Sequence, residues 1–454
     1  MLPLRLLDLT APEMAELCAG LRAARSVLLG RRATELAELL GRVGARFLDD
    51  NDPLRREALA RLPAGAGLSA AMAREVLDGM ARDWLPERLR ALLAAEFEDP
   101  EVLDRFRPGP RESVRALGPA LTLHLGAGNV PGVSVTSLVR GLLVKSPVLL
   151  KPGRSDAVLP VLFARALADA DPEVAKAVAV VYWPGGEGDA EAESLRRADL
   201  VVAYGGEAAL RAVRDRLPVT TRFLPYHHRI SFGVIAREAG EGGAAGSAPG
   251  VARVARDAAR AAALFDRRGC VSPHLFYVEE GGEVAPREWA RMIAEGLREV
   301  ERELPSGAVT AGEASEVHQF RGTAELSAAA GSGVELHRDE GIGWTVIFDP
   351  DPAFEVSCPG RTVRVKPVHD VREIAELVRP YGALLQTVGF AGRTGAVPDE
   401  DERFGRLVEE LGRAGAFRVC SFRALPWPPP WWHHDGSGPL RALVRWVEVE
   451  EGVP

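Results

Sequence analysis

The sequence has few cysteines, and their positions exclude two classes of protein. Four are present in 454 residues, at Cys18, Cys270, Cys358 and Cys420, and no two of them form a CxxC pair. Disulfide-stapled domains and cysteine-rich zinc sites both need cysteines in closely spaced sets. We therefore expect neither a disulfide framework nor a zinc cluster.

Long apolar runs and an excess of basic charge are also lacking. No uninterrupted hydrophobic segment approaches the ~20 residues of a membrane helix, and the stretch from Met1 to Arg5 has no signal-peptide pattern. The net charge is −8 and the arginines are dispersed, which does not indicate a nucleic-acid groove. These absences predict a cytoplasmic protein without a membrane span or a nucleic-acid partner.

The sequence does contain enough apolar residues for several cores. Hydrophobic residues make up 46% of the chain and charged residues 26%, as in ordinary globular proteins. A length of 454 residues allows two or three domains. From Ala11 to about Phe97, apolar residues recur at helical spacing, so we expect a helical layer with little functional content.

Strand-turn-helix units with glycine in the turn follow this layer. The first runs from Leu121 through Gly126-Ala127-Gly128-Asn129 into a helix at Ser134–Leu143. Three more strands are expected at Val144–Leu150, Val178–Tyr182 and Leu200–Ala203, ending in the turns Lys151-Pro152-Gly153-Arg154, Pro184-Gly185 and Gly205-Gly206, with helices at Val158–Ala168 and Ala190–Arg197. Such repeats predict a Rossmann-like parallel sheet that binds a nucleotide along its carboxyl edge. Taken alone, the glycine-rich turn after Leu125 could equally be purely structural, and the turn from Lys151 to Arg154 could equally be a solvated basic turn.

A second candidate site surrounds Cys270. An alanine-rich helical pattern from Val251 to Ala263 ends in Arg267-Arg268-Gly269-Cys270, just before an apolar strand. A cysteine attacks only as its thiolate, which the two arginines and local backbone dipoles can favour. The alternative is a small cysteine buried in the core, but the glycine and the charged turn argue against burial.

The remaining half predicts further α/β structure and an aromatic tail. We expect helices at Pro286–Glu303 and Val371–Val378, and strands at Thr345–Phe348 and Thr362–Lys366. Trp427-Pro428-Pro429-Pro430-Trp431-Trp432-His433-His434-Asp435-Gly436 contains three of the eight tryptophans. Such a segment either lines a binding mouth or ties a terminal arm to a surface. Its two histidines and aspartate are contiguous and do not share a helix face, so no metal site is predicted.

In combination, these motifs resemble a known superfamily. Gly128-Asn129-Val130-Pro131, Lys151-Pro152, Pro184-Gly185, Gly205-Gly206, Cys270 and Glu355-Val356-Ser357-Cys358-Pro359 occur in the order of the aldehyde dehydrogenases. Arg229-Ile230-Ser231-Phe232-Gly233, the Cys270 segment and the Trp-Pro tail resemble, more narrowly, the LuxC-type acyl-CoA reductases. The resemblance covers about Leu117 to Val447. It implies an aldehyde dehydrogenase-like α/β fold with a Rossmann-like cofactor domain, a second α/β catalytic domain and a small oligomerisation element.

The resemblance also implies roles for individual residues. Cys270 is the nucleophile, and Asn129 donates to the oxyanion together with the backbone N–H of Cys270. Attack on an acyl thioester gives an acyl-enzyme, which hydride from a nicotinamide reduces to an aldehyde. Cofactor-binding roles fall on Lys151 at the adenosine ribose, on Gly205 and Gly206 at the pyrophosphate, on Glu355 at the nicotinamide ribose, and on the Pro184-Gly185 turn.

Two departures from the superfamily pattern refine this interpretation. Arg154 stands where NAD-linked enzymes usually have a glutamate, and an arginine attracts a 2′-phosphate, so we predict NADPH. The Glu-Leu-Gly-Gly segment that carries the hydrolytic base is replaced by Tyr226 to Gly233. Without that base, reduction is favoured over release of the acid. His228 is a candidate proton donor, with a hydrogen-bonded structural histidine as the alternative.

The sequence therefore predicts NADPH-dependent reduction of a long-chain fatty acyl-CoA, or another acyl thioester, to the aldehyde. The alternatives are an aldehyde or semialdehyde dehydrogenase for a smaller substrate, and a non-catalytic scaffold. An acyl-transferring protein partner and a homo-oligomer are expected. The predicted domains are a helical layer at 1–100, a cofactor domain at 101–250, a catalytic domain at 251–425 and a carboxyl-terminal arm at 426–454.

Overall fold

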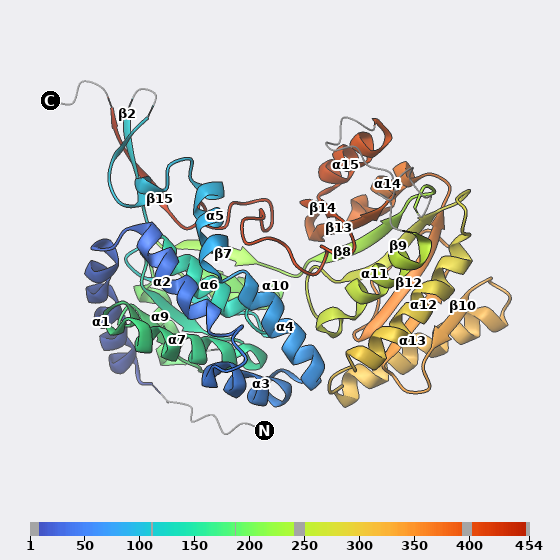
Figure 1. Ribbon diagram of the computed structural model, residues 1–454, viewed down its shortest axis with the longest axis horizontal. Coiled ribbons are helices and arrows are strands. Elements are labelled where there is room, and N and C mark those ends of the chain that lie inside the picture. The colour runs from blue at the N-terminus through green and yellow to red at the C-terminus, as the bar shows by residue number, and fades with distance from the viewer. Residues whose placement is uncertain (1–8, 110–111, 187, 240–249, 393–401, 451–454) are drawn as a thin grey trace. The chain divides into compact units, whose positions relative to one another are not determined.

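The chain forms two compact units, which we describe separately. The computed structural model describes residues 9–109, 112–186, 188–239, 250–392 and 402–450 (Figure 1). The first unit combines Met1–His227 with Pro429–Pro454, and the second is His228–Pro428. Most of the predicted loop from Glu238 to Gly250 lies outside the described residues.

A parallel five-stranded sheet forms the centre of the first unit. Its strand order is β5-β4-β3-β6-β7, and every neighbouring pair is parallel. The strands are β3 (Thr122–Leu125), β4 (Val148–Lys151), β5 (Val178–Val180), β6 (Leu200–Tyr204) and β7 (Arg222–Tyr226). This order places β3 at the centre, where the connections reverse direction, and a ligand crevice is expected at such a point.

Ten helices of the described chain cover this unit, five of them from the amino-terminal layer. The first five are α1 (Ala11–Leu29), α2 (Ala33–Ala45), α3 (Pro53–Ala66), α4 (Ala70–Arg82) and α5 (Pro86–Glu96). The others are α6 (Val133–Leu143), α7 (Val158–Ala170), α8 (Pro172–Ala175), α9 (Asp189–Arg197) and α10 (Glu207–Arg214). Met14, Cys18 and Leu21 of α1 lie in the core that includes Leu123 and Val201, so Cys18 is a packing residue.

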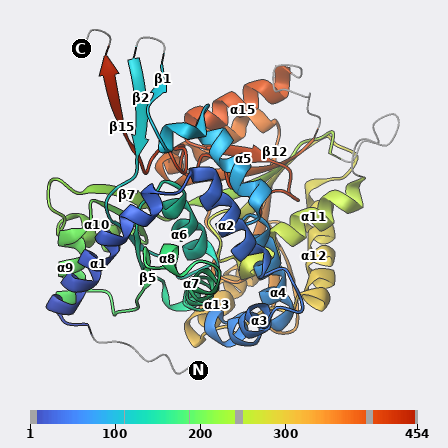
Figure 2. The ribbon, with the colours of Figure 1, turned by 60° about the vertical axis from the view of Figure 1, so that its left-hand side comes forward.

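The carboxyl end of the chain returns to the first unit. There β15 (Arg445–Glu450) pairs antiparallel with β2 (Glu112–Leu117), and the short β1 (Arg107–Pro108) pairs with β2 on its other side. Figure 2 shows the three strands side by side. In this pairing Trp446 lies opposite Ala116, so the carboxyl-terminal arm adds a strand to the sheet.

The second unit is built on a seven-stranded sheet. Its order is β10-β11-β12-β9-β8-β13-β14, parallel throughout except for β10. The strands are β8 (Ile230–Ile235), β9 (Pro273–Glu279), β10 (Glu335–Arg338), β11 (Trp344–Phe348), β12 (Arg361–Val368), β13 (Leu385–Ala391) and β14 (Arg418–Cys420). The helices are α11 (Val251–Ala263), α12 (Pro286–Glu303), α13 (Ala311–Ala329), α14 (Ile374–Val378) and α15 (Glu402–Ala414).

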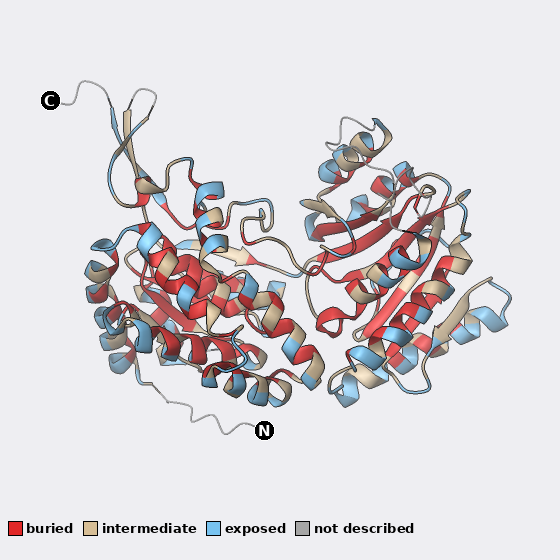
Figure 3. Ribbon diagram, in the orientation of Figure 1, coloured by how far each residue is buried: buried red, intermediate tan, exposed pale blue. Residues whose placement is uncertain are grey.

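Both sheets are buried along their central strands, as Figure 3 shows. In the second unit, Phe232, Tyr277 and Val388 come from three adjacent strands and share one core. These strands are apolar on both faces because helices cover the sheet, which is typical of parallel sheets. The fold class predicted from the sequence, an aldehyde dehydrogenase-like α/β fold, is confirmed by the structural neighbours described below.

Some predicted boundaries are wrong for local reasons. The strand expected from Val144 begins only at Val148, because Lys145 adopts a left-handed conformation (φ 59°) and Pro147 has no N–H to donate to the sheet. The strand expected to end at Tyr182 ends at Val180. The helix expected from Val371 begins with a 3₁₀ turn and becomes α-helical at Ile374.

Other differences concern whole elements. Helix α13 was not predicted from the sequence, because its apolar periodicity is weak. Only Val317, Arg321 and Ala324 of its 19 residues are buried. Strand β8 hydrogen-bonds to β9 and β13, so it lies in the second sheet although it precedes the predicted catalytic domain in sequence. The predicted functional domains themselves stay a prediction.

Candidate active site

The predicted cofactor-binding residues of the first unit gather at one edge of its sheet. Strands β3, β4 and β6 are parallel neighbours, so their carboxyl ends meet at the same edge. Asn129 follows β3, Lys151 ends β4, Pro184 and Gly185 follow β5, and Gly205 and Gly206 follow β6. The carboxyl edge of a parallel sheet is where such folds bind nucleotides.

Two of these turns touch through their backbones. A Cβ atom on Gly153 would overlap the Cα of Gly128, and a Cβ on Gly128 would lie 3.6 Å from the Arg154 nitrogen. Glycine is therefore required where the turn after β3 meets the turn after β4. Because of this close approach, Asn129 and Arg154, both exposed, stand on adjacent turns of the same edge.

Lys151 lies at the end of β4, beside the aromatic residues that follow β5. Its Nζ is 5.8 Å from the centroid of the Tyr182 ring and 6.0 Å from that of Trp183. A Cβ atom on Gly185 would come within 3.8 Å of the same Nζ. The ammonium group is thus held over the Pro184-Gly185 turn, where it can bind an anion or a ribose hydroxyl.

The turn after β6 leads directly into α10. Gly206 is the N-cap residue of this helix and provides no side-chain hydrogen bond to the first turn. The Gly205 nitrogen donates to the Tyr226 carbonyl, 3.1 Å away, which fixes the turn against β7. Helix N–H groups without a side-chain cap, next to two glycines, can donate hydrogen bonds to the phosphates of a dinucleotide. The residues of this edge therefore fit a nicotinamide dinucleotide.

Asp156 also lies at this edge, although it was not among the site residues predicted from the sequence. The buried carboxylate accepts hydrogen bonds from the nitrogens of Gly132 (2.7 Å) and Ser134 (2.8 Å) at the start of α6. It therefore caps the helix that follows the Asn129 turn. The sequence signal was indirect: the N-cap residue of α6 is Gly132, which has no side chain, so a side-chain cap had to come from elsewhere. Burial raises the pKa of Asp156 to about 7, against the effect of these hydrogen bonds.

In the second unit, Cys270 follows a strained turn. Phe265, Asp266 and Arg267 all have left-handed backbones, with φ of 59°, 49° and 57°. Each such residue costs about 1–2 kcal/mol when it is not glycine, so the turn needs strong anchors. One anchor is the buried ion pair between Asp266 and Arg361, at 2.8 Å.

Cys270 itself is half-buried at the amino end of β9. Its carbonyl accepts a hydrogen bond from the buried Ser231 hydroxyl, 2.8 Å away. The Ser231 oxygen also accepts from the Thr387 nitrogen at 3.2 Å, so the cysteine is tied to β8 and β13. His228 lies just before β8 and is exposed. Cys270 and His228 are therefore both at the amino edge of the second sheet.

The two arginines before Cys270 have other described partners. Arg267 donates to the carbonyls of the segment from Ser357 to Gly360, and burial lowers its pKa to about 10. Arg268 donates to the Ala308 carbonyl at 3.1 Å and forms an ion pair with Glu313. These bonds fix the backbone around the cysteine. That the arginines also favour the thiolate stays a prediction.

Glu355 lies on the segment that joins β11 to β12. Its carboxylate is 2.8 Å from Nη2 of Arg364, and its side chain is 49% exposed. The guanidinium of Arg364 also stacks 4.5 Å from the Phe320 ring centroid. Glu355 is thus oriented by a cation and remains accessible to a ligand hydroxyl.

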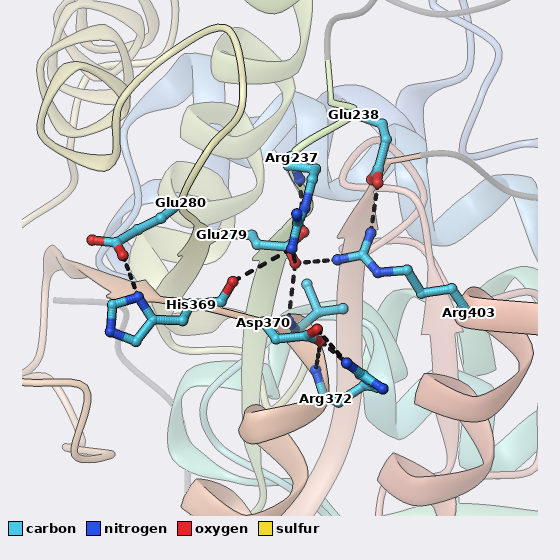
Figure 4. Close-up of polar contacts among 9 residues, drawn as sticks. Arg237, Glu238, Glu279, Glu280, His369, Asp370, Arg372 and Arg403 are labelled. Carbon is cyan, nitrogen blue, oxygen red and sulfur yellow. Dashed lines mark hydrogen bonds and ion pairs between the residues drawn. The ribbon is translucent and has the colours of Figure 1, made fainter.

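The carboxyl edge of the second sheet is occupied by ion pairs (Figure 4). Glu279, whose side chain is fully buried, accepts from the nitrogen (2.9 Å) and Nη2 (2.6 Å) of Arg237 and from the guanidinium of Arg403. The Val371 nitrogen adds a weaker bond at 3.3 Å. Among the described residues of this edge, these donors are therefore paired with Glu279.

The aromatic tail is divided between the two units: Trp427 packs on Phe265 in the second, and the part from Pro429 packs within the first. The His434 ring lies 4.4 Å from that of Tyr226 and 4.8 Å from that of Trp432, while Tyr204 stacks on Tyr226 at 4.7 Å. The guanidinium of Arg88 covers the Trp431 ring at 4.5 Å. These contacts tie the tail to the ends of β6 and β7. In the part of the chain that the structure describes, no group of histidine, cysteine or acidic side chains could hold a metal ion.

Solved structures identify the fold. A putative aldehyde dehydrogenase from Anabaena variabilis superimposes with a TM-score of 0.71, at 15% identity, covering 99% of this chain and 95% of that one. A benzaldehyde dehydrogenase from Corynebacterium glutamicum, described as NAD-dependent, gives 0.71 at 14% identity, covering 98% and 91%. The protein therefore has the aldehyde dehydrogenase fold.

Sequence comparison identifies the family. The model of the acyl-CoA reductase (LuxC) family matches residues 31–446, and the chain belongs to this family. The long-chain acyl-protein thioester reductase of Aliivibrio fischeri is 25% identical over 426 residues, covering 92% of this chain and 82% of that protein. The enzyme of the same name from Vibrio harveyi is 24% identical over 417 residues, covering 90% and 80%. The chain is accordingly an oxidoreductase that acts on acyl or aldehyde groups. Among the described residues, no helix is long and apolar enough to cross a membrane.

Proposed function

We propose that this protein reduces a long-chain fatty acyl thioester to the aldehyde with NADPH, through an acyl-Cys270 intermediate. The observation that carries the proposal is the family match over residues 31–446, which includes Cys270 in its anchored turn at the amino end of β9. The relatives from Aliivibrio fischeri and Vibrio harveyi are named for the reduction of long-chain acyl-protein thioesters. We place this protein in the cytoplasm, in line with the sequence-based prediction.

The chemistry assigns one step to each residue. The Cys270 thiolate attacks the thioester carbonyl, and the Asn129 amide and the Cys270 N–H stabilise the oxyanion, where one donor is worth about 3 kcal/mol. Collapse releases the donor thiol and leaves the acyl-enzyme. A nicotinamide cofactor, when bound, supplies hydride. A second collapse frees the aldehyde and the thiolate, and His228 is the proposed proton donor for the departing group.

The cofactor assignment rests on the carboxyl edge of the first sheet. Lys151 would hold the adenosine ribose or its phosphate, the turn with Gly205 and Gly206 would accept the pyrophosphate, and Pro184-Gly185 would line the site. Glu355 would bond the nicotinamide ribose. Arg154 is exposed on the turn after β4 and supports NADPH, because a guanidinium attracts a 2′-phosphate that a carboxylate would repel.

The acyl donor and the assembly are further parts of the proposal. Acyl-CoA and a protein-bound acyl thioester share the reacting group, and the names of the relatives favour the protein-bound form. An acyl-transferring protein is therefore the proposed partner. A homo-oligomer formed through the β1-β2-β15 sheet is proposed from the family resemblance; its outermost strand, β15, is mostly exposed.

Intact-mass spectrometry tests the function directly. The wild type is incubated with palmitoyl-CoA without a cofactor, and we expect one palmitoyl adduct that hydroxylamine removes and NADPH discharges as aldehyde. Cys270→Ser should form no hydroxylamine-sensitive adduct. Cys420→Ser is the matched control, because burial raises the pKa of the Cys420 thiol to about 11, and it should react as the wild type does.

The other outcomes separate the alternatives. An adduct that forms only with a shorter acyl thioester would indicate a smaller substrate. An adduct that forms only with an acylated carrier protein would identify the protein-bound donor. Failure of every donor to acylate Cys270 would contradict the proposed function and favour a scaffold.

A further inference from the structure

We infer that Arg267 is a positioning residue that holds the Cys270 turn and the Glu355 segment in one fixed relation. The inference deepens the proposed function, since it rests on the roles assigned there to Cys270 and Glu355. Those two residues serve different half-reactions, acyl transfer and hydride transfer. One buried side chain would thereby govern the geometry of both.

The hydrogen bonds of Arg267 all cross from one segment to the other or to the start of β9. Its Nε donates to the Gly360 carbonyl at 2.8 Å, and Nη2 donates to the carbonyls of Ser357 (3.1 Å) and Cys358. Its Nη1 lies 2.9 Å from Nδ1 of His274, which follows Cys270 by four residues. A guanidinium can reach these acceptors together because its five N–H groups form a rigid planar fork.

His274 accepts the Arg267 hydrogen bond only in its neutral form. Burial and, to a smaller extent, the charge of the neighbouring Arg267 together lower the pKa of His274 to about 3. The imidazole is therefore neutral at physiological pH and offers a lone pair to the guanidinium. This bond fixes the side chain of Arg267 relative to β9, the strand that begins just after Cys270.

The bonds of Arg267 also account for the strained backbone before Cys270. The left-handed conformation of Arg267 itself points its side chain across to the Glu355 segment, and the cost of about 1–2 kcal/mol for this residue must be offset by its contacts. Asp266, the preceding residue, is fixed independently by Arg361 and by the Gly307 nitrogen at 3.1 Å. The turn is thus anchored twice, and the Arg267 anchor bonds directly to the carbonyls of the Glu355 segment.

A second bond joins the same two segments. The Ser357 hydroxyl donates to the His274 carbonyl at 2.6 Å, so the Glu355 segment is also tied to β9 two residues after Glu355. On its other side, Glu355 is held by Arg364 of β12, and β12 pairs with β9. The Glu355 carboxylate and the Cys270 thiol therefore lie on segments that hydrogen bonds join to each other within the second unit.

The test measures each role without needing the full reaction. The rate of Cys270 alkylation by iodoacetamide at pH 7 is followed by peptide mass spectrometry, and the Kd values for NADPH and NADH are measured by fluorescence titration. In Arg267→Lys, which keeps the charge but not the fork, we expect the alkylation rate to fall about tenfold and the Kd of the preferred cofactor to rise about tenfold. A side chain that only adds stability would change neither value well below the melting temperature.

Arg321→Lys is the matched control. Arg321 is buried in the same unit and donates to Thr345 Oγ1 and the Trp344 carbonyl, each at 2.8 Å, with an ion pair to Asp339. Its loss should lower the melting temperature to a similar extent and leave the alkylation rate and the Kd values unchanged. If Arg267→Lys does not fold, Ser357→Ala cuts the parallel bond and should change both readouts about threefold.

Each outcome decides the inference. Changes in both readouts, with Arg321→Lys unchanged, support it; a change in one readout alone, or in neither, overturns it. Failure of the proposed function looks different. It would appear as a wild-type Cys270 that is alkylated no faster than an ordinary thiol, or as wild type that binds neither cofactor.

Discussion

The two parallel sheets of this protein use their edges in opposite ways. In the first, glycine turns, Lys151 and the uncapped start of α10 stand at the carboxyl edge with donors available to a ligand. In the second, the corresponding edge is closed by Glu279 and its arginines, and Cys270 lies at the amino edge. We propose ligand binding at the carboxyl edge of the first sheet, whereas the donors described at the corresponding edge of the second sheet pair with Glu279.

The largest expected effect is at the amino edge of the second sheet. Cys270→Ala should lower aldehyde formation about 10⁴-fold, because it removes the proposed nucleophile that forms the acyl-enzyme. The free energy of unfolding and the Kd of the cofactor should stay close to those of the wild type. Steady-state assays, denaturant unfolding and cofactor titration check the three quantities. Residual activity within tenfold of the wild type would remove Cys270 from the mechanism.

The closed carboxyl edge should show the reverse behaviour. Glu279→Gln leaves the guanidinium groups of Arg237 and Arg403 without their carboxylate, which we expect to cost about 2–3 kcal/mol of unfolding free energy. At 25 °C, kcat/KM should remain within twofold of the wild type. Glu280→Gln is the control: this neighbour is half-exposed and pairs with the exposed His369, so stability should change little. A large loss of kcat/KM in folded Glu279→Gln would mean that this edge takes part in function.

The open carboxyl edge should control the choice of cofactor. Arg154→Glu replaces a cation by the carboxylate that repels a 2′-phosphate, so the ratio of kcat/KM for NADPH to that for NADH should fall about tenfold or more. Arg165→Glu, on the exposed surface of α7, provides a matched charge change away from the edge. An unchanged ratio in Arg154→Glu would contradict the assignment of NADPH.

The smallest expected effect is a difference in the pH dependence of stability. It separates the contribution of the buried Asp156, at the first edge, from that of the buried Glu279, at the second. Asp156 has a pKa of about 7 in the folded state, above its ordinary 3.8, so its stabilising contribution is present at low pH and is lost as the pH rises from 4 to 7. Burial raises the pKa of Glu279, but the bonds from Arg237 and Arg403 outweigh this and lower it. Its contribution is present above pH 4.5 and is lost as the pH falls.

Urea unfolding of Asp156→Asn and Glu279→Gln across this range tests the opposite signs. Relative to Asp156→Asn, the wild type should lose stability as the pH rises from 4 to 7. In the comparison with Glu279→Gln it should instead lose stability as the pH falls below 4.5. Parallel pH profiles for the two variants would contradict the contrast between the edges.

The sequence predicted those parts of the structure that depend on local signals. Glycines after apolar runs predicted the turns of the first sheet, and the helix at Pro286–Glu303 ends where its pattern ends. The candidate site residues of the first unit could be placed on one edge because parallel strands share that edge. Their roles toward a ligand stay predictions.

What could not be predicted depends on partners far apart in the chain. Glu279 and Arg403 are separated by 124 residues, and Asp156 caps a helix 22 to 24 residues before it. The left-handed turn at Phe265–Arg267 uses residue types that rarely adopt this conformation, so no local sequence signal predicted it. Its cause is the set of buried bonds made by Asp266 and Arg267 elsewhere in the fold.

The pairing of β15 with β2 has a consequence for synthesis on the ribosome. The first unit needs a strand that is translated after the whole of the second unit, because Arg445–Glu450 pairs with Glu112–Leu117. The second unit is continuous in sequence and can form while the chain is still growing. The side of β2 that receives β15 must then stay unpaired until Arg445–Glu450 emerge, so the unit that carries Cys270 can be completed before the unit with the glycine turns.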